Sequence, residues 1–129
     1  MVDSIKITYD DADIRDIRIE FGEEEKHLKD PVKMFCIDTL PPELNHEVEE
    51  SETELVVKSN NGEATLTHIL RFLYIVMKLI VKEGDKFNKP DFKVDDIDFG
   101  VVQEDIEVAM KSDYKQMTVL LDNFEVKEN

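Results

Sequence analysis

Residues 66–81 have the sequence LTHILRFLYIVMKLIV, the most apolar stretch of the chain. Its apolar side chains recur at the three- and four-residue spacing of a helix, at Leu66, Ile69, Leu70, Leu73, Val76, Met77 and Ile80. Polar residues interrupt the stretch, so it falls short of the roughly 18–20 apolar residues that a membrane-spanning helix needs. We therefore predict a buried core helix that is capped near Thr65 and ends before Gly84.

Short strands are predicted on the N-terminal side of this helix. Ser4–Tyr9 alternates apolar and polar residues, and Ile14–Phe21 alternates again after an aspartate-rich turn at 10–13. These two segments predict an N-terminal β-hairpin. Glu54–Lys58 has the sequence Glu-Leu-Val-Val-Lys, which predicts a third, buried strand before the helix.

The segment between the hairpin and the third strand has a helical part and an acidic part. An apolar stripe with the i, i+4, i+7, i+8 spacing of a helix is formed by Leu28, Val32, Phe35 and Cys36. Pro41 and Pro42 end whatever helix precedes them. Residues 43–54 hold six glutamates among twelve residues. This composition predicts an acidic, solvated loop over 43–54.

Two short helices are predicted at the C-terminal end of the chain. A polar loop over 84–92 and an acidic extended segment over 94–99 lead to a first helix within Val101–Ser112. Tyr114 marks a break, and a last short helix follows with its apolar residues at Met117, Leu120, Leu121 and Phe124. The charged residues 125–129 are expected to form a frayed tail.

Length and charge limit the classes of function. The 129 residues suit a single domain over 1–129. With 31 acidic and 16 basic residues the net charge is −15, which disfavours binding to nucleic acid or to anionic membranes and favours a basic protein partner. Cys36 is the single cysteine, so no internal disulfide forms. In the absence of an N-terminal apolar segment, we expect a cytoplasmic or nuclear location.

The motifs of catalytic and metal-binding sites are missing or incomplete. Asp98-Phe99-Gly100 matches the magnesium-binding tripeptide of kinases, but the chain has no glycine-rich loop and no His-Arg-Asp loop. Asp96, Asp98 and Glu107 imitate a calcium loop, yet Val101 takes the position that requires glycine. The histidines have no second ligand at metal-binding spacing: His27, His46 and His68. We predict no catalytic residues, no cofactor and no metal, and hence not an enzyme.

The order of the predicted elements resembles the BTB/POZ fold, and within it the Skp and elongin C adaptors of cullin ubiquitin ligases. Ser4–Ile7 with its aspartate turn is similar to their opening hairpin, and the acidic insertion before Leu55 falls where Skp proteins carry an acidic loop. Ile69–Leu73 resembles their long helix. The stretch 96–122 resembles their C-terminal run through Phe99, Gln103, Tyr114 and Leu120-Leu121-Asp122.

The resemblance implies a small α/β (α+β) domain in which an N-terminal hairpin and a third strand pack against a helical cluster. It also implies an adaptor that links a substrate receptor to a cullin, with a cullin and a receptor box helix as partners. In the family, an Asn-Tyr/Phe-Leu step between the last two helices helps to face the cullin. Here the step is Asp113-Tyr114-Lys115, and the chain lacks the extra C-terminal helices of Skp proteins, so its extent is closer to elongin C.

The resulting hypothesis is a protein-binding surface that includes a tyrosine exposed at the helix break and methionine anchors: Met110, Asp113, Tyr114, Met117 and Leu121. Two alternatives stay open at this point. Met110, Met117 and Leu121 could each close the core instead. The domain could also be a BTB-type self-association module, a homodimer without cullin binding.

Overall fold

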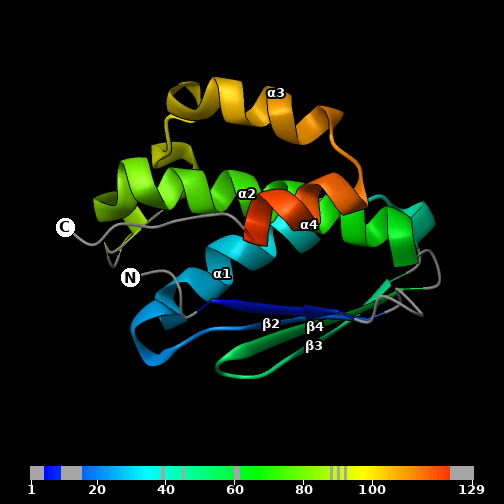
Figure 1. Cartoon of the computed structure of the whole chain (residues 1–129). Helices are drawn as coiled ribbons and strands as arrows, with labels where there is room; N and C mark the ends of the chain where they lie inside the picture. The colour runs from blue at the N-terminus through cyan, green and yellow to red at the C-terminus, as the bar shows by residue number, and fades with distance from the viewer. Residues whose placement is uncertain are drawn as a thin grey trace.

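The sheet is four-stranded, antiparallel and covered by helices on one face (Figure 1). The computed structural model describes residues 5–9, 16–38, 40–44, 46–59, 62–87, 89, 91 and 93–122. The strands are β1 (Lys6–Tyr9), β2 (Asp16–Glu20), β3 (His46–Glu50) and β4 (Glu54–Ser59), in the spatial order β1-β2-β4-β3. The mixed α/β class, the N-terminal hairpin and the strand over 54–58 are thus confirmed. The predicted turn at 10–13 lies outside the described residues.

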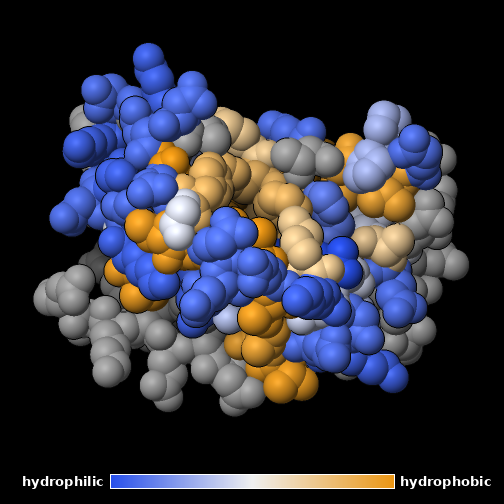
Figure 2. Space-filling model, turned by 90° about the horizontal axis from the view of Figure 1, so that it is seen from above, coloured by the Kyte–Doolittle hydropathy of each residue, from blue (hydrophilic) through white to orange (hydrophobic). Residues whose placement is uncertain are grey.

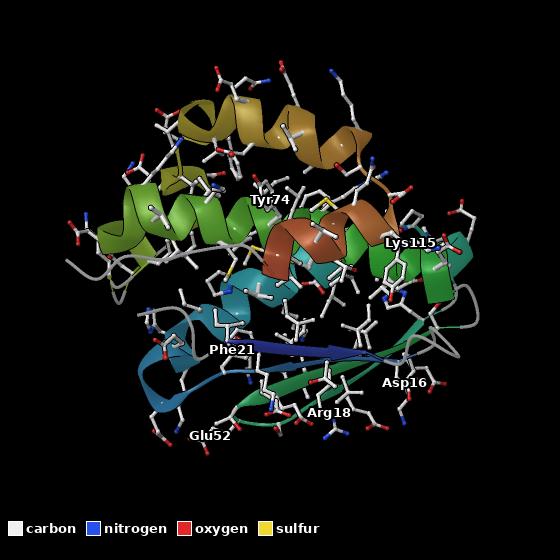
Figure 3. All side chains as sticks on the ribbon, viewed as in Figure 1. Asp16, Arg18, Phe21, Glu52, Tyr74 and Lys115 are labelled. Atoms are coloured by element: carbon white, nitrogen blue, oxygen red, sulfur yellow. The ribbon has the colours of Figure 1, made fainter. Side chains whose placement is uncertain are left out.

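Alternation decides which face of the sheet is buried. In β2, Ile17 and Ile19 are buried, whereas Asp16 and Arg18 are exposed. Figure 3 shows Asp16 and Arg18 on the side of the sheet away from the helices. Because side chains alternate across a strand, this pattern leaves one solvated face and one face that packs on the helices.

The prediction of a loop over 43–54 is wrong, because a strand forms there. Pro42–Leu44 make a 3₁₀ turn (η4), and β3 then pairs with β4 along its whole length. Figure 3 shows Glu52 in the turn that joins β3 to β4. Glu50 forms ion pairs of 2.9 Å with both Lys29 and Lys33, and Glu52 pairs with Lys26 at 2.8 Å. These lysines remove the charge repulsion that would otherwise keep the glutamates apart in solvent.

A pH dependence follows from this cluster. Hydrogen bonds from Lys29 and Lys33 lower the pKa of Glu50 from its ordinary 4.5 to about 2. A depressed pKa in the folded state stabilises the protein fully above pH 4.5 and loses that contribution as the pH falls towards 2. We expect Glu50→Gln to lower the Tm at pH 7 and the difference from wild type to shrink towards pH 2.

Thermal melts between pH 7 and pH 2 check this expectation. Glu47→Gln is the matched control, because Glu47 is an exposed residue three positions earlier in the same strand. The control is expected to leave the acid branch of the curve close to that of wild type. A Glu50→Gln difference that stays constant across this pH range would contradict the role of the ion pairs.

The helical segment between the hairpin and β3 contains three short elements. Glu23–Leu28 is a 3₁₀ helix (η2), Lys29–Val32 is α1, and Lys33–Ile37 is a π-helical turn (η3). The predicted apolar stripe is confirmed, since all of its members are buried in the core: Leu28, Val32, Phe35 and Cys36. This segment lies between the sheet and the long helix (Figure 1).

The long core helix is confirmed, but its predicted start is wrong, since α2 (Gly62–Phe87) begins before Thr65. Helical geometry breaks at Glu83 (φ −131°, ψ 28°), beside the end predicted before Gly84, and a further helical segment then continues to Phe87 inside the loop predicted over 84–92. Thr65 is within the helix, and its hydroxyl donates to Ser59 Oγ over 2.8 Å instead of capping the helix end. By length and composition α2 could cross a membrane, but 56% of its most apolar window is buried in the fold, as in the core helix of a soluble protein.

The C-terminal part begins with turns where an extended acidic segment was expected. Val94–Asp96 and Phe99–Val102 form the 3₁₀ turns η5 and η6. α3 (Gln103–Lys111) and α4 (Tyr114–Asp122) follow, so the two short helices are confirmed. In Figure 1, α2 crosses the helical layer, α4 lies beside it and α3 lies farthest from the sheet. Residues 125–129 of the predicted tail are outside the described part of the chain.

Candidate interaction surface

The junction between α3 and α4 has a fixed geometry. Asp113 Oδ1 accepts a hydrogen bond from the backbone N–H of Gln116, and the N–H of Asp113 donates to Gln116 Oε1, both over 3.0 Å. This reciprocal pair is the capping-box arrangement that fixes the first turn of a helix. Arg71 of α2 donates through Nε to the carbonyl of Ser112 over 2.9 Å, which ties the junction to the long helix. The start of α4 is therefore determined by side chains on both elements.

The capping pair decides where Tyr114 points. Because Asp113 precedes the helix, Tyr114, Met117 and Leu121 fall at i, i+3 and i+7 on one face of α4. Tyr114 is 6% exposed and Met117 is fully buried, and both belong to the core cluster. The expected exposure of Tyr114 is thus wrong. For Met117 the alternative of a core residue is correct.

The other three predicted surface residues lie in different surroundings. Met110 is 46% exposed at the end of α3, and Asp113 is also exposed. Leu121 is partly buried and lines a cavity between α4, α2 and β1. Of the predicted set, the structure leaves Met110 and Asp113 as neighbours at an accessible helix end.

Further exposed apolar residues on these helices were not foreseen from the sequence. Val108 is 44% exposed on α3 and Val119 is 58% exposed on α4, although valine favours burial. Val102 at the end of η6 and Ala109 of α3 are buried at i and i+7, and Val108 lies off this stripe. An apolar residue off the stripe is the signal that could have revealed it. Figure 2, which looks down on the side that carries α3, shows apolar residues across the middle of this face with charged residues around them.

Polar contacts add to the packing of Ile106 and Ala109 in attaching α3 to α2. Lys82 Nζ donates to the carbonyl of Val101 over 2.8 Å and lies 3.6 Å from Asp105 Oδ2. The Tyr74 hydroxyl is 3.5 Å from Asp105 Oδ1, and Figure 3 shows Tyr74 between α2 and α3. Burial, followed by the nearby Asp105 carboxylate, raises the pKa of Tyr74. These contacts position α3, and the raised pKa keeps the Tyr74 hydroxyl protonated at neutral pH.

Cys36 and His68 both lie in packed surroundings. Burial raises the pKa of the fully buried Cys36 thiol, so it stays protonated and unreactive at neutral pH. Burial, and then the charge of Arg71, lower the pKa of His68, whose ring stacks on Phe72 at 4.9 Å. Within the described ranges, no group of three or more His, Cys, Asp or Glu side chains could hold a metal ion.

The tripeptide Asp98-Phe99-Gly100 has a local structural explanation. Asp98 Oδ1 accepts a hydrogen bond from the backbone N–H of Gly100 over 2.9 Å and caps η6. Phe99 packs edge-to-face on Phe35, with ring centroids 5.7 Å apart. The carboxylate is therefore engaged in starting a helical turn and the phenyl ring in packing against η3.

We define the C-terminal helix surface by Val108, Met110, Asp113 and Val119. It combines large exposed apolar side chains with a carboxylate on two helices whose junction is fixed. Comparisons with protein-family models, with curated proteins and with solved structures found no match to this chain.

Proposed function

We propose that the protein is a non-catalytic interaction adaptor, similar in role to the Skp and elongin C subunits that link a substrate receptor to a cullin. The observation that carries the proposal is the exposure of Val108, Met110 and Val119 on the two C-terminal helices. Exposed methionine and valine side chains on a positioned helix pair offer apolar area that a partner can bury.

The order of elements supports the same role. A hairpin, a helical segment, a buried strand, a long apolar helix and two short helices follow one another along the chain. This is the order on which the resemblance to the BTB/POZ adaptors rests. β3 is an addition to it, and it occupies the position of the acidic insertion.

The exposed charges near the C-terminal helix surface also indicate what kind of partner would bind there. Glu104, Glu107 and Asp113 are exposed on α3 and at its junction with α4, and helix spacing places Glu107 between Val108 and Met110 on the outer side of α3. A partner that brings both apolar and basic side chains would match these residues, since complementary charges speed association and fix orientation. In this proposal the partner contacts Met110 and Asp113, and the buried Tyr114 only supports them from below.

A charged substitution on the C-terminal helix surface tests the proposal. We expect Met110→Asp to reduce recovery of the partner at least about tenfold in an affinity pulldown from native cell extract, because truncating or charging an interface anchor costs 1–2 kcal/mol or more. Met34→Asp is the matched control, since Met34 is 43% exposed on η3 and should retain the partner. Both variants are expected to melt close to wild type, as surface changes usually do.

Mass spectrometry of the recovered proteins identifies the partner class. A cullin or a receptor box protein that is recovered by wild type and lost with Met110→Asp would support the adaptor role. Equal recovery by Met110→Asp and wild type would exclude the C-terminal helix surface. A stable dimer in sedimentation, with no other protein recovered, would favour the self-association module instead, against the repulsion expected from a charge of −15 on each copy.

A further inference from the structure

β1 lies at one end of the sheet and is paired along only one of its sides. Its residues Lys6–Tyr9 pair with β2, and no strand among the described residues lies on the other side. An edge strand presents a row of N–H and C=O groups that can pair with another extended chain. Because β1 has apolar residues on its inner face at Ile5 and Ile7, the edge also has one side that favours apolar contact.

A cavity lies immediately beside this edge. Its volume is about 330 Å³, and it is lined by residues of β1, α2 and α4 and by Ile5 just before β1: Ile5, Lys6, Ile7, Leu70, Met77, Thr118 and Leu121. This volume falls in the range of sites that accept a ligand or several side-chain groups. Leu70 and Met77 come from α2, and Thr118 and Leu121 from α4, so a buried helix and a surface helix together form the wall opposite the strand.

We propose that β1 and this cavity bind an extended segment of a partner protein by strand addition. The main chain of the segment pairs with the free side of β1, and one of its apolar side chains enters the cavity. In strand-addition complexes of this kind, main-chain hydrogen bonds give affinity and pockets for alternate side chains give specificity. The site is separate from the C-terminal helix surface and does not depend on the adaptor role.

The charge of Lys6 indicates which residue of the bound segment should stand next to its apolar residue. Lys6 is the only charged residue among those described around the cavity, and its side chain is exposed. On its β2 side it is opposite Glu20. An added strand would place a residue beside Lys6 on the other side, where a carboxylate attracts and an ammonium repels. We therefore expect an apolar residue followed or preceded by Glu or Asp.

A second copy of the chain is a poorer occupant than such a segment. Each copy carries a charge of −15, and bringing two copies edge to edge brings these charges together. A short extended segment with one or two acidic residues carries far less charge than a second copy, so it meets a smaller repulsion at the same edge. The proposal therefore commits to a partner segment with alternating apolar and acidic residues.

Binding of synthetic peptides to the full chain tests the site. The probe is the peptide Thr-Leu-Glu-Leu-Glu-Val-Thr with both ends blocked. A comparison peptide carries Lys at both Glu positions. A third peptide has the acidic sequence with alternate amides N-methylated, which removes main-chain donors. Titrations are followed by NMR through the amides of Lys6–Tyr9 and the methyl groups of Ile7 and Leu121.

We expect the acidic peptide to shift these signals and to bind roughly three- to thirtyfold more tightly than the Lys peptide. Lys6→Glu should reverse the preference, whereas Lys93→Glu, the same charge change at an exposed residue outside the cavity, should leave it unchanged. The N-methylated peptide should bind at least several-fold more weakly than its parent.

Other outcomes overturn the proposal. The proposal is wrong if the acidic peptide does not bind at millimolar concentration or if its NMR shifts lie outside β1. It is also wrong if the N-methylated peptide binds as tightly as the unmethylated acidic peptide. A dimer that forms without peptide and shifts the same β1 amides would assign the edge to a second copy. Partner recovery in the Met110→Asp pulldown reports on the C-terminal helix surface alone, so either proposal can fail without the other.

Discussion

Replacing Tyr114 with alanine is expected to lower the free energy of unfolding by about 3–5 kcal/mol, because a buried aromatic ring is removed and leaves a cavity behind. The ring is 6% exposed and belongs to the core beneath α4. For a domain of this size the loss corresponds to a fall in Tm on the order of 10 °C. Urea unfolding followed by circular dichroism measures the change.

Lys115→Ala is the matched control for Tyr114→Ala. Lys115 is the next residue of α4, is exposed, and lies at the start of the helix in Figure 3. Its replacement should change the unfolding free energy by no more than about 0.5 kcal/mol. If Tyr114→Ala instead kept the wild-type stability and abolished partner binding, Tyr114 would be a contact residue and its burial in the core would be wrong.

Replacing Leu73 with alanine is expected to cost about 2–5 kcal/mol, the usual range for a large aliphatic side chain in a packed core. Leu73 is buried near the middle of α2 and belongs to the main core cluster. Val81→Ala, on the same helix at a position that is 44% exposed, should cost no more than about 0.5 kcal/mol. Parallel urea titrations of the two variants give the comparison directly.

The pair of variants also tests α2 as a core helix. A helix packed in the core has one sensitive and one tolerant face, so Leu73 and Val81 should differ strongly. A cost at Val81 equal to that at Leu73 would mean that Val81 is covered in solution, by a second molecule or by a lipid phase. That result would contradict the assignment of α2 as a helix of this domain alone.

The elements that the sequence predicted well are those in which local pattern and burial agree. Alternation over Ile17 and Ile19 leads to a strand buried on one face, and the apolar run of Leu55–Val57 leads to a strand in which all three residues are buried. The spacing along 66–81 leads to α2 for the same reason. In each case the apolar residues themselves carry the packing, so a one-dimensional pattern is sufficient.

β3 could not be recognised in this way, since its stability depends on a distant part of the chain. Its glutamates have the composition of a solvated loop, and Lys26, Lys29 and Lys33 supply the compensating charges from η2, α1 and η3. These lysines recur at i, i+3 and i+7, so they form a basic stripe on one helical face. The presence of this basic stripe and of an acidic segment in one chain is the signal from which the pairing that stabilises β3 could be predicted.

The burial of Tyr114 could have been predicted from the spacing of two residues beside it. Asp113 and Gln116 have the spacing of a capping box, and that spacing places the helix start at Tyr114. A prediction that treats Tyr114 as a break starts the last helix three residues too late, at Met117, and therefore leaves the Tyr114 ring exposed. The exposure of Met110, in contrast, depends on the position of α3 over α2, which the polar contacts of Lys82 and Asp105 determine.

The attachment of α3 has a consequence for the order in which the molecule opens. Ala109 is the one fully buried side chain of α3 itself, and Arg71 and Lys82 hold the helix through bonds that water can replace. Lifting α3 uncovers the contacts of Ala109 and Ile106, whereas separating α2 from the sheet exposes most of the core. Partial unfolding of low free energy should thus begin at α3 and leave the rest of the domain folded, as a locally cooperative unit.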